Sequence, residues 1–277
     1  MNPKGAASHD RASDAPAGAS FRNIRIIVAY DGTGFHGWQR QPLVPTVQAC
    51  LEEAIAHVTG EPVKLFGSGR TDAGVHALSQ VANLTSSCPI PLPNFIKAVN
   101  NVLPPDVRVR EACEVPLSFH ARYDVRSKTY RYRILQSEVC LPFLRRYVWH
   151  YPYALDRRQM AAAARRLIGT HDFTSFAASS ASEDDGPEHE KANSSSMTRT
   201  VFSSKVLWSA KTQILIYEVR GTGFLHHMVR NLMGTLVEVG RGKLQADDVI
   251  RILKARDRSL AGPTAPAQGL CLTRVEY

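Results

Sequence analysis

The sequence has few cysteines and no long apolar segment. Its 277 residues contain five cysteines and no Cys-x-x-Cys pair, which excludes a zinc ribbon and argues against a disulfide framework. The longest purely apolar runs, such as residues 26–29, are far shorter than the roughly 20 residues that a membrane-spanning helix needs. Residues 1–20 also lack the apolar core of a secretory signal. These absences predict a cytoplasmic protein that does not enter a membrane.

Acidic residues are also fewer than basic ones. Against 34 lysines and arginines stand 25 aspartates and glutamates, so the formal net charge is +9. With 44% hydrophobic residues, the composition is that of a globular protein and not of a disordered one. The excess of positive charge is compatible with a nucleic-acid partner, although a globular protein with an ordinary basic surface has the same composition.

Two stretches are too poor in apolar residues to order themselves. Residues 1–20 are rich in Ala, Gly, Ser and Pro, which predicts a disordered tail. Residues 177–196 combine serines with five acidic residues, and this composition predicts a mobile acidic surface insertion. The rest of the chain is therefore more basic than the whole. We expect an N-terminal α+β domain at residues 21–118 and a C-terminal α+β domain at residues 119–277, which contains the insertion.

Hydrophobic periodicity predicts two halves with a similar order of elements. Thr46 and Asp156 are suited to cap the first helix of each half, and Gly60 to end the earlier one. The expected strands are residues 24–30, 63–66, 80–84, 107–113, 129–135, 200–208, 213–219 and 270–277. The other expected helices are residues 94–103, 224–239 and 247–254. A doubled β-α-β-β-α-β order predicts an α+β fold with antiparallel sheets and helices on one side.

A glycine pattern, Gly32-x-Gly34-x-x-Gly37, follows the first strand. A dinucleotide site would need this turn to open directly into a helix. Here the helix starts only near Thr46, so a Rossmann site is excluded. Two interpretations of the loop remain. Its aromatic, amide and cationic side chains could contact RNA bases and phosphates, or it is a packed loop with a buried Trp38.

A second glycine-rich loop lies between two expected strands, at residues 67–76. Three glycines within eight residues permit unusual backbone angles and the close approach of a ligand. Arg70 and Asp72 lie two residues apart in this loop. A carboxylate beside a cation is held ionised, which suits a nucleophile or a base and disfavours a general acid. The alternative is an aspartate that caps a turn beside a surface arginine.

His226 and His227 are the pair of residues that most suggests a metal site. Adjacent positions on a helix do not face the same way, and no third ligand follows at a zinc spacing. We therefore expect no metal there, and at least one of the two histidines packed or hydrogen-bonded in the core.

The loop sequence GRTDAGVH, residues 69–76, resembles the active-site motif of the tRNA pseudouridine synthase A family. Four other stretches resemble motifs of that family in the expected order. They are YDG through GWQRQ at residues 30–41, FHAR and SKTYRY at 119–132, GTHDFTSF at 169–176, and FLHHMVRN at 224–231. The resemblance runs from about residue 24 to the C-terminus and leaves out the acidic insertion.

The resemblance implies a pseudouridine synthase fold whose two halves form a central RNA-binding cleft. It implies an isomerase that converts uridine to pseudouridine at positions 38, 39 and 40 of the tRNA anticodon stem-loop. It also implies a homodimer that gathers one tRNA across both subunits. No metal or cofactor is expected, because the isomerisation consumes nothing, and the sequence shows no cofactor motif.

Four residue roles follow from the resemblance. Asp72 would be the covalent catalyst, and Arg230 would pair with it. Tyr130 would stack on the target uracil, and Arg70 would fill the space that the displaced base leaves. Flipping a base out of its stack costs a few kcal/mol, and an aromatic ring and a planar guanidinium are side chains that offset such a cost.

Two rival functions remain at this point. One is a non-catalytic RNA-binding protein with the same doubled fold, since such units are common RNA binders. It would have no need of Asp72 between cationic and aromatic partners. The other is a nucleotide-dependent enzyme built on the Gly32–Gly34 turn.

Overall fold

The computed structural model describes residues 21–178 and 196–277. The predicted tail at residues 1–20 and nearly all of the predicted acidic insertion lie outside the described residues. The domain boundary predicted at residue 118 stays a prediction.

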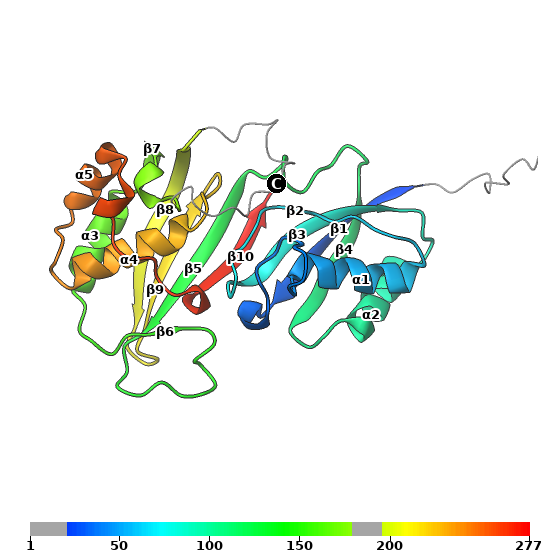
Figure 1. The fold of residues 1–277 in the computed structure, drawn as a ribbon, viewed down its shortest axis with the longest axis horizontal. Coiled ribbons are helices and arrows are strands. Elements are labelled where there is room, and N and C mark those ends of the chain that lie inside the picture. Colours follow the sequence, from blue (N-terminus) through cyan, green and yellow to red (C-terminus); the bar gives the residue numbers. More distant parts are fainter. Residues whose placement is uncertain (1–20, 179–195) are drawn as a thin grey trace, which may run out of the picture.

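One ten-stranded sheet runs through the molecule (Figure 1). Eight strands lie in the order β4-β1-β3-β10-β5-β9-β8-β7, while β2 pairs with β3 and β6 pairs with β5. Neighbouring strands are antiparallel except in the pairs β10–β3 and β5–β6. The strands are β1 (Arg22–Tyr30), β2 (Phe66–Gly67), β3 (His76–Ser86), β4 (Val107–Val115), β5 (Ser127–Leu135), β6 (Trp149–His150), β7 (Gly169–Asp172), β8 (Thr198–Ser209), β9 (Ile214–Gly221) and β10 (Leu270–Glu276).

The C-terminal strand joins what the sequence predicts as separate sheets. Cys271 and Leu272 of β10 pair in parallel with the start of β3, and the whole of β10 pairs with β5 on its other side. The α+β class is confirmed, but the described residues form one continuous sheet. Periodicity identifies a strand and says nothing about its partner, so this connection was not predictable from the pattern.

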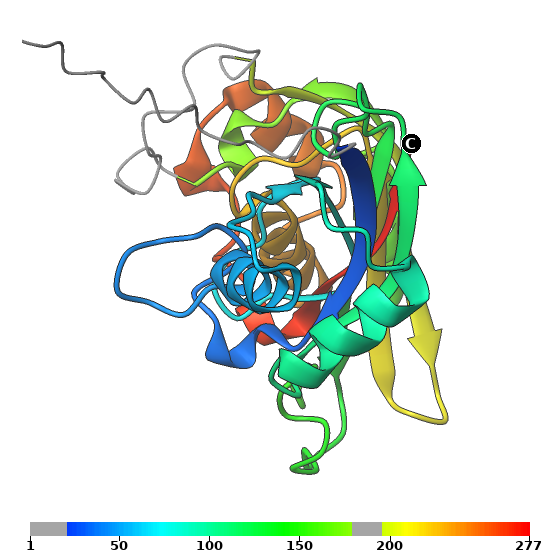
Figure 2. The same cartoon turned by 90° about the vertical axis from the view of Figure 1, so that its right-hand side faces the viewer.

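Five α-helices accompany the sheet within the described residues: α1 (Val47–Thr59), α2 (Leu92–Val102), α3 (Arg157–Arg165), α4 (Met228–Gly240) and α5 (Asp248–Ala255). The two predicted caps are confirmed. The Thr46 hydroxyl accepts from the backbone N–H of Ala49, and the Asp156 carboxylate accepts from the backbone N–H groups of Arg158 and Gln159. Gly60 ends α1 in the left-handed conformation, with φ 75°. Helices α1 and α4 lie on the same side of the sheet (Figure 2).

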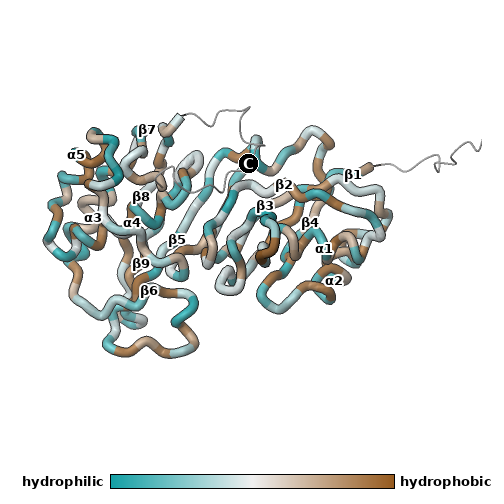
Figure 3. Tube along the Cα trace, viewed as in Figure 1, coloured by the Kyte–Doolittle hydropathy of each residue, from teal (hydrophilic) through white to brown (hydrophobic). Residues whose placement is uncertain are grey.

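The core lies between this side of the sheet and the helices. Ile24, Ile26 and Val28 alternate along β1 and are fully buried, as are Tyr132 of β5 and Tyr217 of β9. Apolar and polar residues are interspersed along the described part of the chain (Figure 3). Among the described residues, no helix has the length and apolarity that crossing a bilayer would take.

The predicted elements differ from the observed ones mainly at their ends. β2 is two residues long where residues 63–66 were expected to form a strand, and β6 and β7 were not predicted. Helix α4 begins at Met228 and not at residue 224, because His227 has a left-handed backbone, with φ 58°. This late start leaves His226 and His227 outside the helix.

Candidate active site

The loop at residues 68–75 connects β2 to β3, and its first residues are held from both sides. The Ser68 N–H donates to the Val81 carbonyl at 2.7 Å, and its hydroxyl donates to Gln80 Oε1 at 2.6 Å. The amide of Gln80, which is fully buried, donates to the Gly69 carbonyl at 2.8 Å. These bonds fix the start of the loop, which we call the Asp72 loop.

The glycine-rich turn after β1 packs directly against the Asp72 loop. The Trp38 N–H donates to the Thr71 carbonyl at 3.1 Å, and the Thr71 hydroxyl lies 2.8 Å from that of Tyr30. Gly37 has φ 84°, and a Cβ there would lie 2.5 Å from the Thr71 carbonyl oxygen. Trp38 is 2% exposed. The packed-loop interpretation is therefore the correct one for Trp38, whose ring is not available to RNA bases.

Asp72 of the loop contacts Arg230 of α4. Arg230 Nη1 donates to Asp72 Oδ2 at 3.0 Å, and the two side chains are only 17% and 16% exposed. Arg230 is also held from behind, because its Nε donates to the Ala265 carbonyl at 2.8 Å. A charge-assisted bond with little solvent around it orients the carboxylate firmly.

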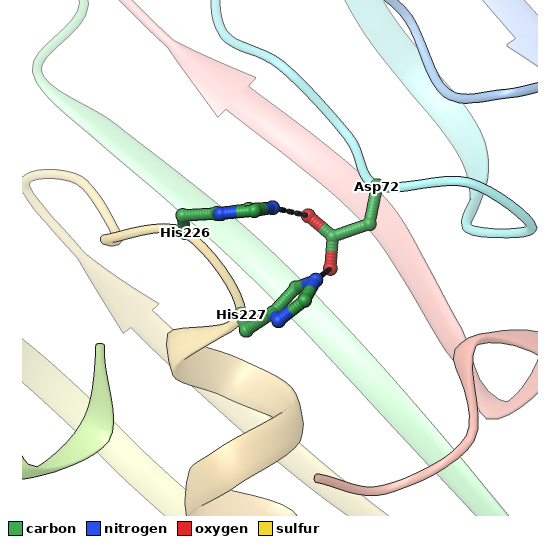
Figure 4. Close-up of side chains that lie close together, drawn as sticks. All are labelled: Asp72, His226 and His227. Carbon is green, nitrogen blue, oxygen red and sulfur yellow. Dashed lines mark ion pairs between the residues drawn. The ribbon is translucent and has the colours of Figure 1, made fainter. Parts of the chain in front are cut away.

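The two histidines both face Asp72 (Figure 4). His226 Nε2 lies 3.7 Å from Asp72 Oδ1, and His227 Nε2 lies 3.6 Å from Oδ2. Their ring centroids are 4.0 Å apart. The expectation that these residues point apart is wrong, because both precede α4 and the left-handed backbone of His227 turns the two rings toward one side.

Asp72, His226 and His227 could in geometry hold a metal ion, since their ligand atoms lie within 4.8 Å of one another. Arg230 places its positive charge 3.0 Å from Asp72 Oδ2 and so would repel a cation held by this carboxylate. These residues are therefore better suited to the Asp72–Arg230 ion pair than to binding a metal ion. Burial, opposed by the charge of Asp72, holds the pKa of His227 below its usual value, so this imidazole is neutral at neutral pH.

Tyr130 lies on β5 and is 7% exposed. Its ring meets Phe224 edge-on, with the centroids 5.2 Å apart. Burial and the nearby charge of Asp72 raise its pKa, so the phenol stays protonated. Arg70, two residues before Asp72, is exposed. The structure therefore brings Asp72, Arg230 and Tyr130 together below the surface and leaves Arg70 on the outside of the loop.

Lys128 is a site residue that the sequence reasoning did not single out. Its Nζ donates to the Ser68 carbonyl at 2.6 Å, and a Cβ at Gly69 would displace this ammonium group. Burial, helped by the charges of Arg122 and Arg199, lowers the pKa of Lys128 to about 8. Its spacing of two from Tyr130 on a strand places both side chains on one face, and this was the available signal.

The family model described as tRNA pseudouridine synthase matches residues 26–124 and 163–277. The chain is similar to tRNA pseudouridine synthase A of Solibacter usitatus, with 51% identity over 92% of this chain and 100% of that protein. It is 46% identical to tRNA pseudouridine synthase A of Thermoanaerobacter sp. strain X514, with the same coverage.

Among solved structures, a chain in the crystal structure of a Cbf5-Nop10-Gar1 complex aligns with 90% of this chain and 57% of its own length. The TM-score is 0.30 and the identity 13%.

Proposed function

The chain belongs to the tRNA pseudouridine synthase family, an isomerase family that forms pseudouridine in tRNA, and on that premise we propose its targets and its catalyst. The targets are the uridines at positions 38, 39 and 40 of the anticodon stem-loop. Asp72 is the covalent catalyst, and Tyr130, Arg70 and Arg230 support it.

The observation that carries this proposal is the state of the Asp72 carboxylate. Oδ2 accepts a hydrogen bond from Arg230 at 3.0 Å. Among the described residues, Oδ1 has no hydrogen-bond partner, and His226 approaches it only to 3.7 Å. An oriented carboxylate with one uncommitted oxygen is suited to act as a nucleophile.

The isomerisation needs one nucleophilic carboxylate and consumes no second substrate. The N1–C1′ bond breaks, a C5–C1′ bond forms, and the hydrogen at C5 is lost to water while N1 gains a proton. Asp72 Oδ1 forms a transient bond to the base or to the ribose, and that bond breaks again before the product leaves. The residues serve both routes equally.

Base flipping is part of the proposal, because a uracil stacked in the stem could not reach the partly buried carboxylate of Asp72. The ring of Tyr130 lies close enough to Asp72 for the charge of Asp72 to raise its pKa. This ring would stack on the flipped uracil. Exposed Arg70 would take the vacated place in the stem, because its planar guanidinium can stack on bases. A homodimer that gathers one tRNA and a cytoplasmic location belong to the same proposal and rest on the sequence.

The rival functions fare differently. Gly32–Gly34 forms a short 3-10 helix, and α1 begins only at Val47. The turn therefore does not present a helix N-terminus to a dinucleotide, and the nucleotide-dependent enzyme has no support. A non-catalytic RNA binder gives no reason for the partly buried ion pair of Asp72 and Arg230.

Mapping of pseudouridine in unmodified tRNA tests the proposal. Transcripts carrying uridine at positions 38, 39 and 40 are incubated with the pure protein, and pseudouridine is located by chemical probing and primer extension. We expect modification at these positions and none in transcripts that carry cytidine there. Modification elsewhere in the tRNA would contradict the proposed target, and no modification at all would contradict the enzyme.

A further inference from the structure

Three aromatic rings form a continuous row beside the Asp72 loop. Phe66 meets His120 with centroids 5.0 Å apart, and His120 meets Tyr123 at 4.4 Å. Tyr123 is 66% exposed and Phe66 is 37% exposed. Large aromatic side chains that are exposed next to one another indicate a binding surface, and a nucleic-acid substrate would supply the bases that cover it. We call Phe66, His120 and Tyr123 the aromatic row.

Two cations flank this row. Lys64 Nζ lies 5.5 Å from the centroid of the Phe66 ring, and the Arg122 guanidinium lies 6.0 Å from that of Tyr123. The nearby carboxylate of Asp124 is engaged with the backbone, since it accepts from the His120 N–H at 2.8 Å. Burial, opposed by Asp124 and helped by Arg122, holds the pKa of His120 below its usual value, so this ring is neutral.

The segment that carries two of the rings is held by buried amides. Asn83 is 4% exposed, and its Oδ1 accepts from the Ala121 N–H at 2.9 Å. Asn23 is 2% exposed, and its amide donates to the Pro116 and Phe119 carbonyls. Asn83 in turn donates to Asn23 at 3.0 Å. A loop built on this network presents His120, Arg122 and Tyr123 without having to order first, which lowers the entropic cost of binding.

The aromatic row leads directly into the site. Phe66 belongs to β2, and the residue after β2 is Ser68, the first of the Asp72 loop. Lys128 links the two regions, because it donates to the Ser68 carbonyl while the charge of Arg122 acts on it. A strand of RNA that enters the site with its target base would therefore pass over these rings.

We infer that the aromatic row binds unpaired nucleotides of the tRNA next to the target uridine. Their bases stack on Tyr123 and Phe66, and Arg122 contacts a phosphate between them. Stacking platforms flanked by cations are how proteins hold single-stranded RNA without reading its sequence. This inference rests on the proposed function in taking tRNA as the ligand, and it adds a second contact outside the catalytic pocket.

Tyr123→Ala and Tyr123→Phe, assayed for tRNA affinity by filter binding, test the inference. Loss of one base–aromatic stack should weaken binding about 5- to 100-fold, whereas Tyr123→Phe keeps the ring and should bind like the wild type. Tyr153 is 69% exposed and lies outside the row, so Tyr153→Ala is the matched control and should leave affinity unchanged. Arg122→Gln should lower the salt dependence of binding by about one phosphate contact.

The outcomes separate this inference from the proposed function. Wild-type affinity in Tyr123→Ala, or equal weakening in Tyr123→Phe, overturns the aromatic row. A change of oligomeric state in Tyr123→Ala, measured by light scattering with tRNA affinity intact, makes the row an interface between copies and also overturns it. A wild-type protein that makes no pseudouridine, but whose tRNA affinity depends on the Tyr123 ring, supports the row and contradicts the enzyme.

Discussion

Asp31 and Asp72 lie in two loops that pack against each other, and both have histidine and arginine neighbours. Asp31 Oδ1 accepts from the Thr33 N–H at 3.0 Å and from its hydroxyl at 2.5 Å, and Oδ2 accepts from the Tyr147 hydroxyl at 2.9 Å. His76 Nδ1 lies 3.2 Å from Oδ1. Both oxygens of Asp31 are thus committed, whereas Asp72 accepts a single hydrogen bond among the described residues.

The difference separates a carboxylate that holds structure from one that can react. Asp31 is 10% exposed, and its hydrogen bonds tie the Gly32–Gly34 turn to Tyr147, far along the chain. Asp72 keeps one oxygen uncommitted and has histidine rings at 3.6 and 3.7 Å in place of donors at bonding distance. A histidine and an arginine near an aspartate are therefore not enough to identify a catalytic residue, and the proposal for Asp72 rests on its uncommitted oxygen.

The largest effect is expected from Asp72→Asn. An amide has no nucleophilic oxygen, so turnover should fall at least about 10³-fold, while tRNA affinity stays within a few fold. Asp31→Asn is the matched control, and its turnover should remain near that of the wild type. Release of tritium from tRNA labelled at uridine C5 measures both. Equal losses in the two variants would abolish the distinction between the two aspartates.

A smaller effect is expected from Gly37→Ala, which disturbs the contact between the glycine-rich turn after β1 and the Asp72 loop. Its φ of 84° and a Cβ 2.5 Å from the Thr71 backbone oxygen force the Asp72 loop to move. Displacement of a catalytic group should lower turnover about 10- to 100-fold. Gly34→Ala is the control, because a Cβ there meets nothing within 4 Å. Similar turnover in both variants would show that the two loops are not mechanically coupled.

The smallest effect is expected on stability, from Asp31→Asn. Burial alone would raise the pKa of Asp31, but the hydrogen bonds from Thr33 and Tyr147 outweigh it and hold the pKa below its usual value. The ionised form is thus favoured by the fold, and this stabilisation is complete above the unfolded pKa of about 4 and lost as the pH falls through the lower folded pKa.

Urea unfolding measures this effect. At pH 7 the free energy of unfolding of Asp31→Asn should lie about 2 kcal/mol below that of the wild type, and the gap should close below about pH 4. Tyr147→Phe, which removes one of the three bonds, should lose only part of this stability. A gap that is independent of pH would mean that the charge of Asp31 contributes nothing.

Much of the fold could be predicted from local chemistry. Thr46 and Asp156 indicate helix starts, because their side chains can accept hydrogen bonds from the unpaired N–H groups of a first turn. The alternating apolar residues of β1 predict a strand with one buried face. The start of α4 was misplaced, because nothing in the FLHHMVRN stretch signals that His227 has a left-handed backbone, a conformation that costs energy for a residue with a Cβ.

The sequence by itself determined most of the helices and long strands, the family resemblance and the excess of basic over acidic residues. It also singled out Asp72 and Arg230, although 158 positions separate them. Only the tertiary structure decided that both oxygens of Asp31 are committed, that two adjacent histidines face one carboxylate, and that Lys128 anchors the Asp72 loop. The reason is physical: hydrophobic period and capping are local properties of the chain, whereas these contacts depend on how distant strands pair.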